Sequence, residues 1–446
     1  MARPEFTRSA VLRGGSIVAA GTISSSALAA ALTTILGIEL GDKGFGIYSF
    51  VIATAGLLAA IARFGLGPIV IREIARSRKN KTHLESRTPI LNALAITTFA
   101  SVILIALTIS PIGILALRAA SDLDTTMVGA LALLFASQAL YTVNVESLRG
   151  LHRLGSASFL GLPIQRFVAL ILVLWVVYAT AKDLNVALAL WLTGIAAASS
   201  VMVSGFSLWI RSRKLPGTYP TFADGLYMAK SGVPILLTNV LGITSNRMPI
   251  WVLAALGALE ETGTYALAAA FVALIRLAHK TMIGTLAPFV ATSYFAEDRK
   301  NLQHRIRTVA AATSLLALGA SVALIIAGVT AVPRLFGSDF ENVVPVASIL
   351  LIGTLAMTLA GPSGMVLTVT GNERWMTRAT TFSLVAGAIS IVPAAIIAGA
   401  IGAAFVMALT TVLRVSLQVR YTVRQTNIFT AADFHSLIQM LRGSKP

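Results

Sequence analysis

Long apolar stretches alternate with short polar connections along the whole chain. A helix needs roughly 20 apolar residues to cross the hydrocarbon core of a membrane, and each stretch is long enough to do so. Twelve spans are predicted, at residues 14–38, 46–70, 89–117, 126–148, 159–181, 184–210, 231–256, 263–288, 308–332, 343–369, 379–398 and 401–422. The pattern therefore predicts an all-α polytopic membrane protein.

The overall composition agrees with this prediction. Hydrophobic residues make up 56% of the chain and charged residues 12%, and the mean hydropathy is +0.82. The absence of cysteine excludes disulfides and thiolate metal sites. A net charge of +17 would suit a nucleic-acid partner, but most basic residues lie in the connections between spans. We therefore expect membrane lipids around the protein and no nucleic acid bound to it.

The basic residues also predict the orientation of the chain. The connections on the side of the N-terminus, with the C-terminal tail, hold Arg3, Arg8, Arg13, Arg72, Arg76, Arg78, Lys79, Lys81, Arg87, Arg149, Arg153, Arg211, Arg213, Lys214, Lys230, Arg299, Lys300, Arg305, Arg307, Arg374, Arg378, Arg420, Arg424, Arg442 and Lys445. The opposite side has Lys43, Arg118, Lys182 and Arg334. Because cytoplasmic loops are enriched in Lys and Arg, both termini are predicted to be cytoplasmic.

The first span could also be interpreted as a cleavable signal peptide. Basic residues precede an apolar run that contains Ala27-Leu28-Ala29, a motif typical of a cleavage site. The run continues to Leu40, however, and the segment has a counterpart in the second half of the chain. We therefore expect a retained helix.

An internal repeat divides the chain into two six-span halves. Gly46-Ile47-Tyr48 matches Gly263-Thr264-Tyr265 at an offset of 217 residues, and the same offset relates Arg63 to Lys280. An even number of spans gives both halves the same orientation, which predicts a binding site between two bundles. The expected domains are an N-terminal bundle at 1–214, a cytoplasmic interfacial connector at 215–230, a C-terminal bundle at 231–422 and an amphipathic tail at 423–446.

Two short amphipathic helices are expected on the cytoplasmic surface. Thr221 and Asp224 form a capping-box pattern at the start of the first. In the tail, Thr430 and Asp433 are expected to cap a helix, and its apolar stripe consists of Phe434, Leu437, Ile438 and Leu441.

Basic side chains in the eighth span are the strongest functional signal. Arg276, His279 and Lys280 are related by three or four positions, so they share one helix face, and the span contains no acid. Charged groups at membrane depth are costly and usually face a bundle interior or a water-filled path. This face is therefore predicted to line a cavity for an anionic ligand. His279 could also carry a coupling proton, although the sequence favours a hydrogen-bonded structural histidine.

Other polar residues within spans are weaker candidates. Arg63, Arg247 and Arg414 are predicted to line the same cavity, although Arg63 could instead snorkel to the cytoplasm. Arg166, about two turns inside the fifth span, is expected to snorkel rather than to bind a ligand. Asn239 and Asn246 would hydrogen-bond sugar hydroxyls or a neighbouring helix. Glu146 is expected to form an ion pair near the cytoplasmic ends of helices, with proton coupling as the alternative.

Several motifs are absent from the sequence. There is no GxxxxGK[ST] phosphate loop, no HExxH and no acidic cluster with metal-ligand spacing. No metal or other cofactor is expected. Transport would then depend on an H+ or Na+ gradient, or on the gradient of the substrate.

The order of motifs resembles a known family of flippases. The first half carries Leu40-Gly41-Asp42-Lys43-Gly44-Phe45-Gly46-Ile47-Tyr48, then Arg63-Phe64-Gly65-Leu66-Gly67 and Ile71-Arg72-Glu73-Ile74-Ala75-Arg76; the second carries Gly263-Thr264-Tyr265, Leu335-Phe336-Gly337 and Thr370-Gly371-Asn372-Glu373. This order is similar to that of the polysaccharide (O-antigen type) flippases of the multidrug/oligosaccharidyl-lipid/polysaccharide exporter (MOP) superfamily. The chain departs from the family at Asn246-Arg247, where the resemblance leads us to expect an acid.

The resemblance implies two bundles that form a V-shaped central cavity and work by alternating access. Its implied cargo is a polyprenyl-pyrophosphate-linked oligosaccharide, carried across a bacterial inner membrane together with other polysaccharide assembly proteins. One rival is a multidrug exporter of the same superfamily, but cationic drugs need acids in the cavity. A second rival is a membrane-embedded glycosyltransferase, which needs a loop-borne site that the short external loops do not provide.

Overall fold

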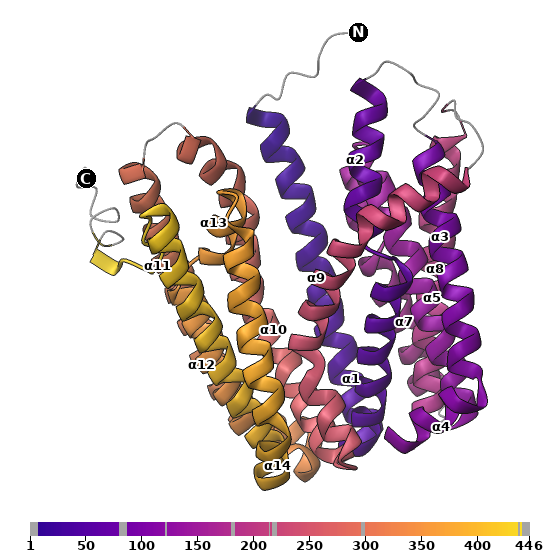
Figure 1. The fold of residues 1–446 in the computed structure, drawn as a ribbon. Coiled ribbons are helices and arrows are strands. Elements are labelled where there is room, and N and C mark those ends of the chain that lie inside the picture. The colour runs from indigo at the N-terminus through magenta and orange to yellow at the C-terminus, as the bar shows by residue number, and fades with distance from the viewer. Residues whose placement is uncertain are drawn as a thin grey trace. The chain divides into compact units, whose positions relative to one another are not determined.

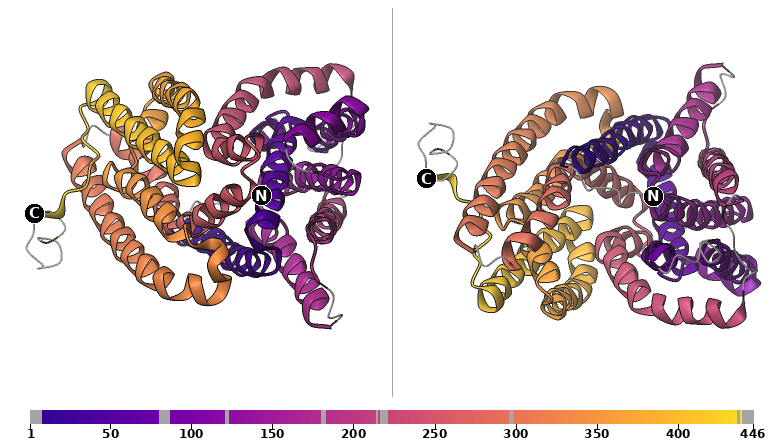
Figure 2. Two further views of the ribbon diagram at one scale, coloured as in Figure 1. Left: turned by 90° about the horizontal axis from the view of Figure 1, so that it is seen from below. Right: turned by 90° about the horizontal axis from the view of Figure 1, so that it is seen from above.

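The computed structural model describes residues 8–79, 87–120, 123–179, 183–213, 215, 221–295, 299–435 and 438. The chain forms two compact units, residues 1–247 and 248–446. The predicted boundaries of the two six-span bundles differ from this division and stay a proposal. Within each unit the helices lie alongside one another, as the end-on views show (Figures 1 and 2).

The helices of the first unit follow the predicted spans closely. They are α1 (Arg8–Ala62), α2 (Leu66–Lys79), α3 (Thr88–Ile109), α4 (Pro111–Ala120), α5 (Thr125–Gly150), α6 (Leu154–Phe159), α7 (Leu162–Leu174), α8 (Val186–Ser212) and α9 (Phe222–Ala255), which continues into the second unit. A π-helical turn at Trp175–Ala179 extends α7. Helix α5 packs against α1, α2, α3, α6 and α8, so it forms the centre of this unit.

The second unit contains the remaining helices. They are α10 (Leu259–Phe295), α11 (Arg299–Phe336), a 3-10 turn at Gly337–Phe340, α12 (Val343–Leu359), α13 (Ser363–Val369) and α14 (Glu373–Thr426). Helix α14 packs against α10, α12 and α13. This packing places residues from the eighth, tenth and twelfth predicted spans side by side.

Backbone breaks divide the two longest helices into two spans each. Helix α1 breaks at Gly41, where φ is 66°. Helix α14 breaks at Ala398 and Gly399, and Gly399 has φ 52°. Glycine adopts these left-handed angles without the steric cost of a Cβ. With these breaks counted and α10 included, the described helices cover all twelve predicted spans, which confirms that prediction.

Four predicted spans are broken rather than straight, among them the third, which breaks at Ser110 between α3 and α4. The second span bends at Phe64 and Gly65, both left-handed, and the fifth bends at Gly161. The tenth span turns by 44° between α12 and α13, at the left-handed Gly361. The Cα of Gly65 lies so near the carbonyl oxygen of Gly232 that a side chain at this position would overlap it. The apolar pattern predicted these spans but carries no signal for the bends.

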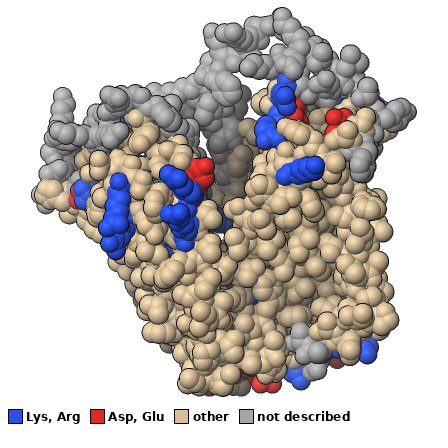
Figure 3. Space-filling model, viewed as in Figure 1, with Lys and Arg blue, Asp and Glu red and all other residues tan. Residues whose placement is uncertain are grey.

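The exposed surface of each unit is strongly apolar. On α3, for example, Phe99, Val102 and Leu107 are at least 58% exposed. The face drawn in Figure 3 carries its charged residues near the ends of the helices, with a wide uncharged surface between them. Such a surface is stable in the hydrocarbon of a bilayer and not in water. The protein is therefore a multi-pass membrane protein.

The predicted capping box is confirmed, but the short helix that it was expected to start is not. The backbone N–H of Asp224 donates to Oγ1 of Thr221 (3.2 Å), and the Thr221 hydroxyl donates to Oδ2 of Asp224 (2.6 Å). The helix that begins here is α9, which runs without interruption into the seventh span. At Gly232 the missing side chain lets α9 pack closely against the backbone of Phe64.

The tail is docked, and the predicted cap is confirmed at Asp433 but not at Thr430. The Thr430 hydroxyl donates to the carbonyl oxygen of Ala360 (2.9 Å), so it does not cap a tail helix. Asp433 accepts the N–H of His435 (3.1 Å) and forms an ion pair with Arg307 (3.3 Å). In the predicted apolar stripe, Phe434 and Ile438 are exposed. Leu437 and Leu441 lie outside the described residues.

Candidate anion-binding site

Arg276 lies at the middle of α10, well away from either end of the helix. Its half-buried side chain donates from Nε to Oγ1 of Thr354 on α12 (3.1 Å). Thr354 is fully buried, and its hydroxyl donates in turn to the carbonyl oxygen of Leu350 (3.1 Å). The threonine therefore has a fixed orientation and holds the guanidinium through one nitrogen, which leaves other N–H groups for a ligand.

A second arginine reaches the same place from α14. Arg414 is half-buried, and it lies near enough to Arg276 and to His279 for their charges to interact. His279 is only 6% exposed, and its Nδ1 makes no hydrogen bond with any residue that the structure describes. We call Arg276, His279 and Arg414 the cationic cluster. Lys280, one position farther along α10, is exposed.

The spans of the second half of the chain supply no counter-charge for the cationic cluster. None of the predicted spans from 263 to 422 contains Asp or Glu. Two guanidinium groups that approach each other in a region of low dielectric repel strongly unless an anion is bound. Arginine binds phosphates and carboxylates with paired N–H groups, so the cluster is a candidate site for an anion.

The candidates of the first unit lie in different surroundings. Arg63 is half-buried at the end of the straight part of α1, and its Nε donates to the carbonyl oxygen of Ala59 (3.2 Å). Its charge interacts with Tyr141 and Glu146. Glu146 forms the predicted ion pair with Arg149, with 2.7 Å between Oε1 and Nη1. Arg63 therefore has an acidic neighbour, which the cationic cluster lacks.

Arg166 was predicted to snorkel to the cytoplasm, and this prediction is wrong. Its Nη1 donates to both the carbonyl oxygen and Oγ of Ser25 in the first span, each at 2.7 Å. Its charge also interacts with Tyr48 and Tyr141. A guanidinium with a polar partner inside the bundle does not need to reach the membrane surface. The run of serines at 24–26 in an otherwise apolar helix was the available signal.

The three candidates on α9 are all exposed. Asn246 donates from Nδ2 to the carbonyl oxygen of Gly242 on its own helix (2.7 Å). Asn239 lies about one turn before Gly242, and Arg247 directly follows Asn246. Hydrogen bonding to the preceding turn is a common way for a polar side chain to be satisfied at membrane depth. The predicted contact of the two asparagines with a sugar stays a prediction, as does the predicted place of Arg247 in the cavity lining.

Comparisons with known proteins agree with the fold. A family model described as "Polysaccharide biosynthesis protein" matches residues 11–294. A multidrug resistance MATE family transporter of the MOP superfamily, in an inward-facing conformation, aligns with a TM-score of 0.73 at 12% identity, over 90% of this chain and 94% of that one. The lipid II flippase MurJ, in an inward closed conformation, aligns with a TM-score of 0.65 at 12% identity, over 96% and 90%.

A MOP superfamily transporter from Pyrococcus furiosus also aligns, with a TM-score of 0.58 at 11% identity over 95% of this chain and 96% of that one. No curated protein is similar to the chain in sequence. The fold is that of the MOP superfamily transporters, and the chain belongs to the polysaccharide biosynthesis protein family. The resemblance that the sequence motifs suggested is thereby confirmed, and the family and fold are not those of a membrane-embedded glycosyltransferase.

Proposed function

We propose that the protein is a flippase for a polyprenyl-pyrophosphate-linked oligosaccharide. It would move this lipid by alternating access from the cytoplasmic to the periplasmic leaflet of a bacterial inner membrane, with both termini in the cytoplasm. The observation that carries the proposal is the approach of Arg276 and Arg414 at membrane depth, in a half of the chain whose spans contain no carboxylate.

The physical barrier to flipping is the charge of the pyrophosphate. Transferring an anion into a medium of low dielectric costs many kcal/mol unless positive groups accompany it. In the proposal, Arg276 and Arg414 bind the pyrophosphate, and Lys280 and Arg63 receive it from the cytoplasm. Arg247, Asn239 and Asn246 would contact the headgroup farther along the path, and the lipid tail would stay in the bilayer.

His279 and Glu146 are proposed to act in coupling or gating. His279 is buried beside Arg414, so a change in its protonation would change the charge of the cationic cluster directly. Glu146 shares its charge between Arg149 on α5 and Arg63 in the turn between α1 and α2. An H+ or Na+ gradient could act through either residue.

A flipping assay with purified protein tests the proposal. Liposomes of phosphatidylcholine would carry a fluorescent polyprenyl pyrophosphate, and dithionite would quench the probe in the outer leaflet. We expect fast, nearly complete quenching with the wild-type protein. Arg276→Gln with Arg414→Gln should slow the reaction at least about tenfold, because each charge-assisted contact contributes about 1.5–3 kcal/mol.

The matched control is Arg118→Gln with Arg334→Gln. This variant removes two exposed arginines, one in the last turn of α4 and one in the last turn of α11. Its net charge is therefore the same as that of the test variant. It should flip the probe at the wild-type rate. Equal rates for the test variant and the wild type would overturn the assignment of the cationic cluster, and an inactive wild type would overturn the proposed cargo.

A drug exporter of the same superfamily is the alternative, because the MATE transporter noted above has this fold. Cationic drugs would be repelled by the cationic cluster. Drug resistance of a strain that overexpresses the protein, lost in the Arg276→Gln variant, would favour this alternative.

A further inference from the structure

A groove lies on the surface of the second unit, between α12 and the end of α14. Its lining is mainly apolar and consists of Ala356, Ala360, Val415, Ser416, Val419, Val423 and Phe429, together with Arg420 and Arg424. Its volume of about 550 Å³ is within the range of sites for small molecules, about 300–1,000 Å³. The groove is separate from the cationic cluster, whose residues do not line it.

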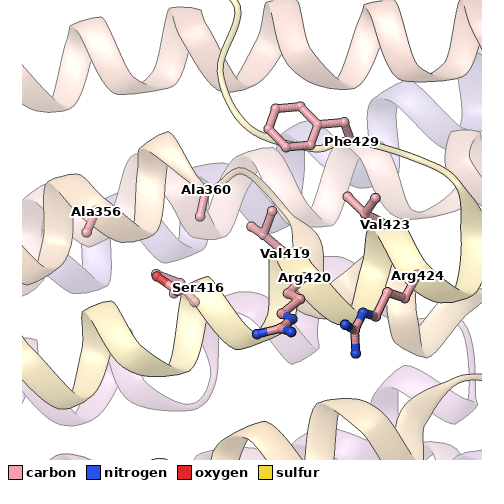
Figure 4. Close-up of a pocket in the computed structure, with 9 residues that line it drawn as sticks. Ala356, Ala360, Ser416, Val419, Arg420, Val423, Arg424 and Phe429 are labelled. Carbon is pink, nitrogen blue, oxygen red and sulfur yellow. The ribbon is translucent and has the colours of Figure 1, made fainter.

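The two arginines form one edge of the groove. Arg420 and Arg424 are one turn apart in the last two turns of α14, and both are exposed. Figure 4 shows their side chains on the same edge, while Val419 and Val423 point toward Phe429 on the other side. No acidic residue lines the groove, and neither arginine takes part in an ion pair among the described residues. One edge is therefore cationic and the floor is apolar.

The opposite wall is fixed by the docked tail. The backbone N–H of Phe429 donates to Oε1 of Gln303 (2.9 Å), and the guanidinium of Arg307 lies 5.5 Å from the centre of its ring. The hydroxyl of Thr430 is bonded to Ala360, which lines the groove itself. The wall therefore has a defined position relative to the floor.

We infer that this groove binds an anionic phospholipid of the cytoplasmic leaflet. Arg420 and Arg424 would bind the headgroup phosphate, and an acyl chain would lie along the valines and alanines. The site lies at the C-terminal end of α14, whose last turn holds Arg424 and which leads into the tail. The charge pattern predicts that this end faces the cytoplasm. Basic residues beside the membrane surface attract anionic lipids, whose negative charge gathers at this leaflet. The inference is independent of the proposed cargo.

Native mass spectrometry of the purified protein, with phosphatidylglycerol or phosphatidylcholine added, tests this inference. The wild type should retain phosphatidylglycerol in preference to phosphatidylcholine. Arg420→Gln with Arg424→Gln should weaken this binding about 25-fold, since each basic residue near an anionic surface contributes about a factor of five. Val419→Trp should also weaken it, because the indole fills the groove without any change in charge.

Arg374→Gln with Arg378→Gln is the matched control. These arginines are also exposed, one turn apart and on α14, near its other cytoplasmic end, but they do not line the groove. This variant should keep the wild-type preference. An equal loss in both double variants would mean that general charge attraction explains the binding, and unchanged binding in the Val419→Trp variant would mean that the lipid lies elsewhere. Either result would overturn the inference.

Discussion

At the scale of single residues, the orientation of the Arg276 side chain depends on its hydrogen bond to Thr354. The hydroxyl of Thr354 is the group that accepts the Nε–H of Arg276 and has no exposure to solvent. Thr354→Val keeps the shape of the side chain and removes the acceptor. We expect transport to fall several-fold because Arg276 loses its orientation, while thermal stability changes by about 1 kcal/mol or less.

The flipping assay and a thermal unfolding curve in detergent check this prediction together. Thr358→Val is the matched control, because Thr358 lies one turn farther on α12, is equally buried and donates to Leu355 of its own helix. It should match the stability of Thr354→Val and retain wild-type transport. Equal transport in the two variants would show that the hydroxyl of Thr354 does not position Arg276.

Residue patterns predicted the functional candidates unevenly. Arg276 and His279 could be identified from the sequence because they lie three positions apart in a span without acids. Basic residues at membrane depth cost free energy and therefore usually mark a functional site. Thr354 could not be identified, because one threonine in an apolar helix is unremarkable without knowledge of its neighbours. Arg166 was misinterpreted because its partner, Ser25, is 141 residues away in the chain. Contacts between distant helices leave no periodic signal.

At the scale of elements, the left-handed glycine at which the tenth span bends lies against the docked tail. A Cβ at Gly361 would overlap the carbonyl oxygen of Thr430, and the position has φ 68°. Gly361→Ala should therefore lower the free energy of unfolding by about 3 kcal/mol or more, from backbone strain and overlap together. It should also make the tail more accessible to protease.

Gly371→Ala separates these two effects. Gly371 also has a left-handed φ, 76°, but a Cβ there would meet no atom within 4 Å. This variant should lose only the strain contribution, about 1 kcal/mol, and its tail should resist protease as in the wild type. Chemical unfolding and limited proteolysis of both variants measure the difference. A protected tail in Gly361→Ala would contradict the role of the glycine in docking.

The break within α14 lies at the end of the helix bundle opposite to Gly361, and a side-chain cap stabilises it. The carboxylate of Glu261, at the start of α10, accepts the N–H of Ala400 through Oε2 (2.8 Å), directly after the left-handed Gly399. Removing such a cap costs about 1 kcal/mol. Glu261→Ala should therefore lower the melting temperature. Its exposed neighbour offers the control, since Glu260→Ala should leave the melting temperature unchanged.

The elements themselves were well predicted, because apolar length is a strong signal in a membrane protein. The gaps predicted between the first and second spans, and between the eleventh and twelfth, match the breaks at Gly41 and Gly399. The bend at Gly361 was not predictable, since it depends on how closely the tail approaches. The continuity of α9 was missed for a similar reason. A capping box marks where a helix begins but not how far it continues.

At the scale of the whole molecule, the distribution of charge predicts which ends of the helices face the cytoplasm. The connections that hold most Lys and Arg precede the first span and follow the second, fourth, sixth, eighth, tenth and twelfth. In each unit, the structure describes exposed residues in a connection rich in Lys and Arg and in a connection on the opposite side. Since the chain has no cysteine, single cysteines can be introduced without removing any natural thiol.

Labelling of intact cells with a membrane-impermeant maleimide tests this orientation. Thr125→Cys and Ser338→Cys, at exposed positions on the acid-richer side, should react without permeabilisation. Arg213→Cys and Thr377→Cys, exposed on the basic side, should react only after the membrane is opened. The reverse pattern would place both termini outside. The pyrophosphate would then meet Lys280 and Arg63 after transport rather than before it, and the proposed direction of flipping would be wrong.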